Sequence, residues 1–541
     1  MRARDLDTLA TTTFDLLVIG GGIHGLAIAY DAASRGLHTA LIESSDFGSG
    51  ASFNHQRTVH GGLRSLQYGR FRYARHSIRE RRALARIAPW MLRPLPFLVG
   101  TYRSVTRGRL PLRIALKIDE WLARDRNTGV EPELHLPAPR LVSKALTLRL
   151  FPGVRSERLT GGAQWYDYQM VEADRLTFAF AAAADRAGAR LANYVEAVSP
   201  LRDGSRISGM QARDTLTGRE LSIRATATVN AAGPHAGAIM TTFGVKREYP
   251  LLKAMSVLTS KAASDMALAG PTSNDRMLTL VPWRGRALVG TSQSRTFAQP
   301  GDTGASAAEV EALVADANLA FPALKISPSD VSLVHRGLVP AVAGRGGVPE
   351  LRMIPEVCDH AREGAEGAFT IFSAKYSSAR GVADQVTSLV ARRLGKRVRP
   401  SRTATTVLPG AGIADHEALA IETARALGLE LSIATIRHLI ARYAERAADV
   451  IKLMHDLPDR RSPLAASTPT IGAEVLYVIR EEMALRLTDI LLRRTSVGAL
   501  GHPGDEAVHE CARIAAAELG WDAARTAEEV SSVNLFYAIR G

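Results

Sequence analysis

Cysteine is almost missing from this chain of 541 residues, which contains only Cys358 and Cys511. Two thiols are too few for a disulfide framework or a thiolate metal site, and so few cysteines are typical of proteins from a reducing compartment. The fourteen histidines are scattered without a metal-ligand spacing such as His-Glu-x-x-His. We therefore predict no metal centre.

Long apolar runs are missing as well. A membrane-spanning helix needs about 20 consecutive apolar residues, but the most apolar early stretch, Phe14 to Ala33, is interrupted by four glycines. The segment before Phe14 mixes arginines with aspartates and has no apolar centre, which argues against a secretory signal. We expect no spanning helix, and two or three domains for a chain of this length.

Acidic residues are scarce between Arg64 and Arg113, where thirteen arginines accompany one acid, Glu80. Such a block is typical of a surface for an anionic partner, which here means lipid headgroups, nucleic acid or a phosphorylated substrate. The alternative is a solvated helix face. Because no nucleic-acid-binding module surrounds the block, we predict no nucleic-acid partner. The apolar, proline-containing segment 90–98 is either an interfacial loop at a membrane or a loop on the core.

The opening segment has the pattern of a strand, a glycine turn and a helix. A short apolar strand leads into Gly20-Gly21-Gly22-Ile23-His24-Gly25, and helical apolar spacing continues to Arg35. Gly20 permits a tight turn, Gly22 lets the backbone approach a pyrophosphate, and Gly25 lets the helix pack closely on the strand. The N–H groups at the start of this helix then face phosphates.

A second strand, over 37–43, ends at Glu43, eighteen residues after Gly25. This is the place of an acid that accepts hydrogen bonds from ribose hydroxyls. Two later features favour FAD over NAD: the small-residue loop from Asp46 to Ser52, and a strand that ends in Asn230-Ala231-Ala232-Gly233. The predicted FAD-binding residues are Gly20, Gly22, Gly25, Glu43, Ser52, Ala197, Ala232, Gly233 and Ser378.

Several other segments carry motifs: His60-Gly61-Gly62-Leu63-Arg64, Val281-Pro282-Trp283 with Gly290-Thr291-Ser292, Leu408-Pro409-Gly410, Ala473 to Ala484, and Arg493-Arg494-Thr495. Together with the opening segment, and in this order, they resemble the FAD-dependent glycerol-3-phosphate dehydrogenases. The resemblance runs from about Phe14 to Trp521.

The resemblance implies an α/β fold class. It consists of a glutathione-reductase-type FAD-binding Rossmann domain with an inserted antiparallel-sheet substrate domain, plus an all-α C-terminal domain. The oxidoreductase region is expected over 1–400, with FAD-binding parts at about 14–100, 155–245 and 350–395 and a substrate-binding part at about 246–349. The helical domain is expected over 401–541, after a linker that begins near Gly395, and its longest helical stretch is 471–492.

The family reaction oxidises glycerol 3-phosphate to dihydroxyacetone phosphate by hydride transfer to flavin, and passes the electrons to a membrane quinone or, in oxidases, to oxygen. Carried over by position, His60 is the proton acceptor and Arg64 a substrate anchor. Lys375 and Arg380 are candidates for stabilising reduced flavin or for binding phosphate. The alternatives are a polar cap beside a glycine turn for His60, and ordinary salt bridges for Lys375 and Arg380.

Some positions depart from the family pattern. The segment 52–57 replaces a serine-rich run that ends in lysine, Ser65 replaces a tyrosine, and Gln293 replaces an aspartate. Val339 replaces an arginine that binds the substrate phosphate. The loss of one bidentate phosphate ligand costs about 2–3 kcal/mol of substrate binding.

Arg336 is a poor substitute, because residues three apart on a strand face opposite sides. That leaves Arg345 or Arg57 as compensating cations. Two alternatives stay open: an FAD oxidoreductase that acts on a different hydroxy or amino substrate, and a non-catalytic flavoprotein.

The resemblance and the arginine block predict a cytoplasmic protein that is peripherally associated with the inner face of the cell membrane. Its predicted partners are a small-molecule substrate such as a polyol phosphate, a membrane quinone and an anionic lipid surface. The oligomeric state is open, with a homodimer as one option.

Overall fold

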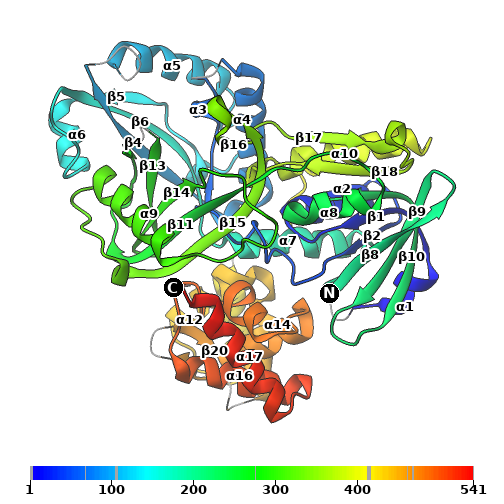
Figure 1. Ribbon diagram of the computed structural model, residues 1–541. Helices are drawn as coiled ribbons and strands as arrows, with labels where there is room; N and C mark the ends of the chain where they lie inside the picture. The colour runs from blue at the N-terminus through cyan, green and yellow to red at the C-terminus, as the bar shows by residue number, and fades with distance from the viewer. Residues whose placement is uncertain are drawn as a thin grey trace.

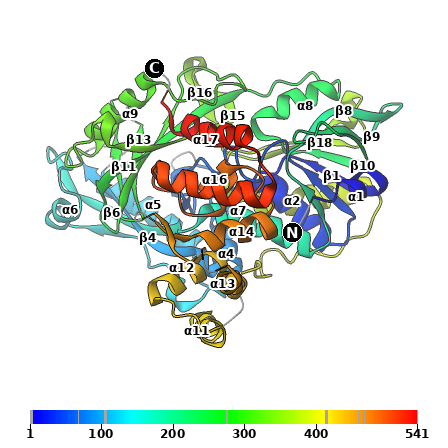
Figure 2. The same cartoon turned by 90° about the horizontal axis from the view of Figure 1, so that it is seen from below.

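The computed structural model describes residues 4–66, 69–103, 108–273, 276–410, 416–457, 459, 461–465 and 468–539. Within these ranges, the side chains of Arg64, Arg345, His416 and Asp456 are outside the description. Two large sheets lie side by side, and the helical C-terminal domain lies below both of them (Figure 1). Seen from below, its helices cross the junction between the two sheets (Figure 2).

The first sheet is built around the glycine-turn unit. Its central strand β1 (Thr13–Ile19) is parallel to β10 (Glu220–Asn230) on one side and to β2 (Thr39–Ile42) on the other. The remaining strands are parallel β7 (Arg190–Ala192) and β18 (Ala368–Phe372), antiparallel β17 (Glu356–Asp359), and the hairpin β8 (Val195–Asp203) and β9 (Arg206–Asp214). The predicted strands on either side of the glycine turn therefore lie next to each other.

Strand β1 is apolar on both faces because both faces are covered. Leu16 and Val18 belong to one core with α2 (Ile23–Ser34), α7 (Ala173–Arg186) and α10 (Ala379–Arg393), whereas Leu17 and Ile19 belong to another. The second core includes residues of α1 (Leu6–Thr11) and α8 (Ala236–Thr242). A parallel strand that is buried on both faces requires such a continuous apolar run.

The second sheet uses more of the chain than the predicted substrate segment 246–349. Its strands in spatial order are β16 (Pro349–Leu351), β15 (Val331–Ala343), β11 (Leu251–Ala262), β14 (Arg286–Gln293), β13 (Met277–Trp283), β12 (Ala267–Pro271), β4 (Leu92–Tyr102), β6 (Leu159–Met170) and β3 (Thr58–Val59), with β5 (Arg140–Val142) beside β6. The segments 92–100 and 159–170, which the sequence placed in the FAD-binding parts, thus belong to this sheet. Strand pairing between such distant segments leaves no local signal.

Of the two alternatives for the proline-containing segment 90–98, the structure supports packing on the protein's own core, but as a strand rather than a loop. Strand β4 pairs along its length with β6, and Leu95, Phe97 and Leu98 are buried. On its other edge β4 pairs with β12 only from Phe97 to Val99. Pro94 lies before this second pairing begins, where a missing N–H interrupts no ladder.

The helices of this half are α3 (Leu63–Leu66), α4 (Phe71–Ile87), α5 (Arg109–Leu122), α6 (Lys144–Leu150) and α9 (Ala307–Ala320). Helix α4 carries six arginines of the block between Arg64 and Arg113. It contacts the turn that precedes α10, so it bridges the two sheets at their junction.

The C-terminal domain is helical and contains a small hairpin, β19 (Pro463–Ala465) with β20 (Thr468–Ile471). Its helices are α11 (His416–Ala426), α12 (Ile433–Tyr443), α13 (Ala447–Asp456), α14 (Gly472–Glu482), α15 (Leu487–Asp489), α16 (Asp505–Leu519) and α17 (Ala523–Tyr537). The expected continuous helix over 471–492 was wrong. Met483 adopts a left-handed conformation (φ 54°) that ends α14, and α15 leads into a π-helical turn, Ile490–Arg494.

The predicted linker after Gly395 is packed rather than free. The carbonyl of Arg399 accepts a hydrogen bond from Arg35 (2.8 Å), and the Leu408 N–H donates to Ile87 (2.8 Å). None of the described helices is long and apolar enough to cross a membrane. Among the described side chains there is also no group of three or more potential metal ligands.

Candidate functional site

The glycine turn lies at the carboxyl edge of the first sheet, between β1 and α2. Gly20 has φ +106°, and a Cβ there would lie 2.5 Å from the carbonyl oxygen of Ala231. A Cβ at Gly25 would lie 1.8 Å from the carbonyl oxygen of Gly20. These two glycines are therefore required by the packing of the strand, the helix and the neighbouring strand end.

Gly22 is different, because the protein leaves space beside it. A Cβ there would meet only the Ser52 hydroxyl, at 3.2 Å, and a Cβ at Gly233 would meet no atom within 4 Å. Gly22 is also the N-cap of α2, whose first N–H groups point out of the turn. The edge thus has an open cradle next to a helix N-terminus, which fits the pyrophosphate of a dinucleotide.

Glu43 and Ser52 hold this cradle in shape. One carboxylate oxygen of Glu43 accepts from the Gly21 N–H (2.6 Å), and the other accepts from the Ser45 N–H (2.8 Å). The Ser52 hydroxyl accepts from the Ile23 N–H (2.9 Å). A carboxylate has about four acceptor positions, so Glu43 keeps capacity for ribose hydroxyls.

The other predicted FAD-binding residues do not all lie at the glycine turn. Ala232 touches the glycine turn, because a Cβ at Gly20 would lie 2.8 Å from its Cα. Ala197 lies in β8, where it pairs with Ala212, and β8 begins beside Glu43. Ser378 is buried, and its hydroxyl donates to the carbonyl of Lys375 (2.7 Å). Ser378 thus shapes the turn that carries Lys375.

His60 forms a pair with a carboxylate. Its Nδ1 lies 3.2 Å from Oδ2 of Asp167, and its Nε2 lies 2.7 Å from the Thr58 hydroxyl. The other oxygen of Asp167 accepts from the Gly61 N–H (2.7 Å) and from Arg81. Asp167 therefore holds the proton on Nδ1 and leaves Nε2 as the basic nitrogen. The side chain of His60 is 44% exposed, so it is accessible to a substrate.

Asp167 is ionised at neutral pH. Burial raises its pKa, but the Arg81 guanidinium and His60 outweigh that effect and lower it to about 2. Gly61 allows this close packing, since a Cβ there would lie 2.4 Å from Nη1 of Arg81. The glycines of the His60 motif thus serve the approach of α4.

Lys375 lies against the same group. Its ammonium donates to the Ser77 hydroxyl (2.8 Å) and to the His60 carbonyl (3.4 Å). Burial lowers the pKa of Lys375 to about 8, and Asp167 opposes this shift. At neutral pH a cation therefore remains beside His60, where it can attract an anionic group.

Arg380 does not add to this group. Arg380 is buried and forms a bidentate ion pair with Glu80 (2.6 and 2.8 Å). This is the ordinary salt-bridge alternative, which ties α10 to α4, so we assign Arg380 no substrate role. Arg64 lies in α3, but its side chain is outside the described part of the structure.

The structure shows the surroundings of several residues at or near the positions that depart from the family pattern. Arg57 is buried, stacks on the Trp283 ring at 4.2 Å and pairs with Asp174 (3.2 Å). Ser65 is also buried. Arg336 and Val339 lie three positions apart on β15 and so face opposite sides, and the Arg336 guanidinium donates to the carbonyl of Phe536 (2.9 Å).

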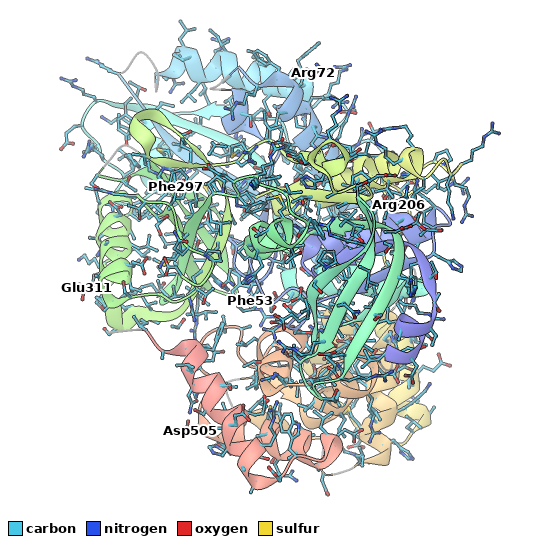
Figure 3. The ribbon with its side chains drawn as sticks, turned by 45° about the vertical axis from the view of Figure 1, so that its right-hand side comes forward. Phe53, Arg72, Arg206, Phe297, Glu311 and Asp505 are labelled. Atoms are coloured by element: carbon cyan, nitrogen blue, oxygen red, sulfur yellow. The ribbon has the colours of Figure 1, made fainter. Side chains whose placement is uncertain are left out.

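Gln293 ends β14, and the side chain of Arg345 is outside the described residues. Phe53, from the segment that replaces the serine-rich run, lies between the two sheets (Figure 3). Its ring is 5.3 Å from that of the buried His335.

Asp167, Arg81 and Ser77 were not among the site residues predicted from the sequence. Arg81 was visible only as one arginine of the basic block. Asp167 has a local signal, a charged residue among Trp165, Tyr166 and Tyr168 in a strand. That signal marks a buried carboxylate but does not name its partner.

Comparison with known families agrees with this geometry. A family model described as FAD dependent oxidoreductase matches residues 15–361, and one described as the C-terminal domain of alpha-glycerophosphate oxidase matches residues 401–526. Both segments lie where the fold places the two sheets and the helical domain.

Curated relatives and solved structures match most of the chain. A glycerol-3-phosphate dehydrogenase of Synechocystis sp. is 30% identical over 515 residues, 91% of this chain and 90% of the relative. The mitochondrial glycerol-3-phosphate dehydrogenase of Homo sapiens is 30% identical over 576 residues, 99% of this chain and 75% of the relative. The FAD complex of glycerol-3-phosphate dehydrogenase from Bacillus halodurans has a TM-score of 0.75 at 23% identity, covering 98% of this chain and 96% of that one.

Proposed function

This chain belongs to the family of FAD-dependent glycerol-3-phosphate dehydrogenases, and from that premise we propose that it oxidises glycerol 3-phosphate to dihydroxyacetone phosphate and passes the electrons to a quinone. Its cofactor is FAD, which accepts a hydride from the carbinol carbon of the substrate when bound. The observation that supports the reaction best is the His60–Asp167 pair with Lys375 beside it.

In this proposal the protein accepts a proton from the substrate and provides a positive charge for an anionic group. His60 accepts the hydroxyl proton at Nε2, and Asp167 stabilises the imidazolium that results. In the substrate-free protein the Thr58 hydroxyl donates to the same nitrogen (2.7 Å), so the substrate hydroxyl has to take its place there. Lys375 supplies a cation for the substrate phosphate or for negative charge on the reduced cofactor.

The proposed function is tested by anaerobic titration of the FAD-loaded protein with glycerol 3-phosphate. We expect the flavin absorbance to bleach at low substrate concentration, because the base and the cation lie together. A flavin that dithionite reduces but glycerol 3-phosphate does not would contradict this substrate.

That second result would favour the alternative that Val339, Ser65 and Gln293 motivate, namely a different hydroxy or amino substrate. A panel of such compounds, tested by the same bleaching, then identifies the class. A non-catalytic flavoprotein predicts no bleaching by any of them. The His60–Asp167 pair favours a catalytic role over that reading, because His60 is accessible and Lys375 lies beside it.

We also propose that the protein docks on an anionic membrane surface, where a quinone is available, through helix α5. Leu110, Ile114 and Trp121 are 69%, 54% and 65% exposed on this helix. Arg113 and Lys117 are also exposed and lie between them. Exposed apolar residues flanked by cations at helical spacing are typical of a helix that lies in the membrane interface. Helix α5 is at the end of the molecule opposite the C-terminal domain (Figure 1).

Only some of the arginines between Arg64 and Arg113 are available for such a membrane surface. Several of its arginines serve internal contacts: Arg81 binds Asp167, Arg75 and Arg82 bind Asp125, and Arg109 donates to the Val142 carbonyl. Arg72, by contrast, is exposed and lies at the same end of the molecule as α5 (Figure 3). The proposed membrane surface is therefore α5 with its neighbouring exposed arginines, rather than the whole block.

Replacing both Ile114 and Trp121 with serine should lower binding to vesicles that contain anionic phospholipid by about a hundredfold or more, because each side chain contributes roughly 1.5–3 kcal/mol when its apolar surface is buried. Co-sedimentation with the vesicles measures the effect, and added salt should weaken binding of the unaltered protein. Leu319 is 46% exposed on α9 and provides the matched control, Leu319→Ser. Equal binding of both variants would remove α5 from the docking surface.

A further inference from the structure

The C-terminal domain meets the first sheet through buried charges next to Glu43. Asp46, three residues after Glu43, is fully buried. It accepts from Arg493 (2.7 Å) and from both terminal nitrogens of Arg494 (2.6 and 3.0 Å). Both arginines belong to the π-helical turn Ile490–Arg494. Burial raises the pKa of Asp46, but the two guanidinium groups hold it below its usual value.

The other side of Glu43 is held by the same part of the C-terminal domain. The Tyr194 hydroxyl donates to Asp489 (2.7 Å), which also accepts from Arg493 (2.7 Å). The Asn193 amide donates to the Met483 carbonyl (2.9 Å). Asn193 and Tyr194 connect β7 to β8.

Glu43 lies between these two contacts. Its backbone N–H donates to the Ala192 carbonyl (3.0 Å), and its carbonyl accepts from the Val195 N–H (2.8 Å). Its side chain holds the glycine turn through the Gly21 N–H, and the Gly48 N–H donates to the Gly21 carbonyl (2.9 Å). The segments on both sides of the acid, and the turn it supports, are thus linked to the C-terminal domain.

Buried ion pairs of this kind impose a particular relative orientation on the two surfaces that they join. Buried ion pairs lose much of their attraction to desolvation, and they are stable only when the partners are accurately aligned. An apolar contact would persist if the domain shifted slightly, but the bidentate hydrogen bonds from Arg494 to Asp46 would be lost.

We propose that Arg493 and Arg494 are positioning residues for the cofactor: the C-terminal domain holds Asp46, and through it Glu43 and the glycine turn, in the conformation that binds FAD. The proposal rests on the FAD binding stated above. Coupling of this kind is reciprocal, so bound FAD tightens the docking of the C-terminal domain to the same extent.

The test is FAD affinity, measured by titrating FAD into apoprotein without substrate. Arg494→Lys keeps the charge but loses the two-pronged contact, and we expect it to raise the dissociation constant of FAD about tenfold. Arg480→Lys is the matched control, because Arg480 makes a bidentate pair with Glu518 (2.6 and 2.7 Å) within the C-terminal domain, 44% exposed and unconnected to Asp46. This control should bind FAD like the unaltered protein. If the contact between Arg494 and Asp46 had only a structural role, Arg494→Lys would lower the melting temperature of the protein but leave the FAD affinity of the folded variant unchanged.

The unaltered protein supplies a second measurement that needs no substitution. Amide hydrogen exchange in the segment 485–497 should be slower with FAD than without it, because of the reciprocal coupling. Equal FAD affinity of folded Arg494→Lys and Arg480→Lys overturns the proposal. If Arg494→Lys does not fold, exchange rates in 485–497 that are the same with and without FAD overturn it. Neither outcome depends on whether glycerol 3-phosphate is the substrate.

Discussion

Replacing Gly22 with valine should give a folded protein that no longer retains FAD. The protein itself has room for the substitution, since a Cβ at Gly22 meets only the Ser52 hydroxyl, at 3.2 Å. The isopropyl group therefore enters the open cradle in which the pyrophosphate has to lie. We expect FAD affinity to fall at least a hundredfold, or roughly 3 kcal/mol, while the far-ultraviolet circular dichroism is unchanged. The absorbance of bound flavin in the purified protein is the measurement.

Gly301→Val is the matched control for this prediction. Gly301 has no atom within 4 Å of an added Cβ, and its φ is not left-handed. It lies in the loop after β14, away from the glycine turn. If Gly22→Val is yellow and fully loaded with FAD, the cradle is not the pyrophosphate site.

Replacing His60 with asparagine should leave FAD bound and slow the reduction of the flavin by glycerol 3-phosphate about 100- to 10,000-fold, the usual range for loss of a general base. Asparagine retains a polar side chain next to Asp167 but has no nitrogen that accepts a proton. Rapid mixing under anaerobic conditions, with flavin absorbance as the signal, gives the rate constant of this step.

His38→Asn is the control for the His60 substitution, because His38 is an exposed histidine that precedes β2. It should reduce the flavin at the rate of the unaltered protein. Should His60→Asn match that rate, His60 is the polar cap of its glycine turn and not the base. Asp167→Asn gives an independent check: it should slow reduction as well, because it removes the carboxylate that holds the proton on Nδ1.

The residues proposed to bind the cofactor could be predicted from the sequence because their signals are local. Gly20, Gly22, Gly25 and Glu43 fall within one strand–turn–helix–strand unit, in which each glycine has a backbone reason that short-range geometry sets. The apolar run before Gly20 also predicted the strand β1, and the structure shows that this strand is buried on both faces. The identity of His60 and Lys375 as site candidates came from the family resemblance rather than from spacing.

The catalytic half depended on contacts between distant segments. His60 and Asp167 are 107 positions apart, and Lys375 and His60 are 315 apart. The same holds for segment 90–98, whose prolines suggest a loop until its pairing with β6 is known.

What the sequence by itself determined is the strand–turn–helix–strand opening with its glycine turn and the helical character of the C-terminal region, because helix periodicity and turn chemistry are properties of neighbouring residues. Only the tertiary structure decided which charges face one another. It assigned Arg380 to Glu80, Arg81 to Asp167, and Arg493 and Arg494 to Asp46. A buried charge must have a partner, but burial does not specify where in the chain that partner lies.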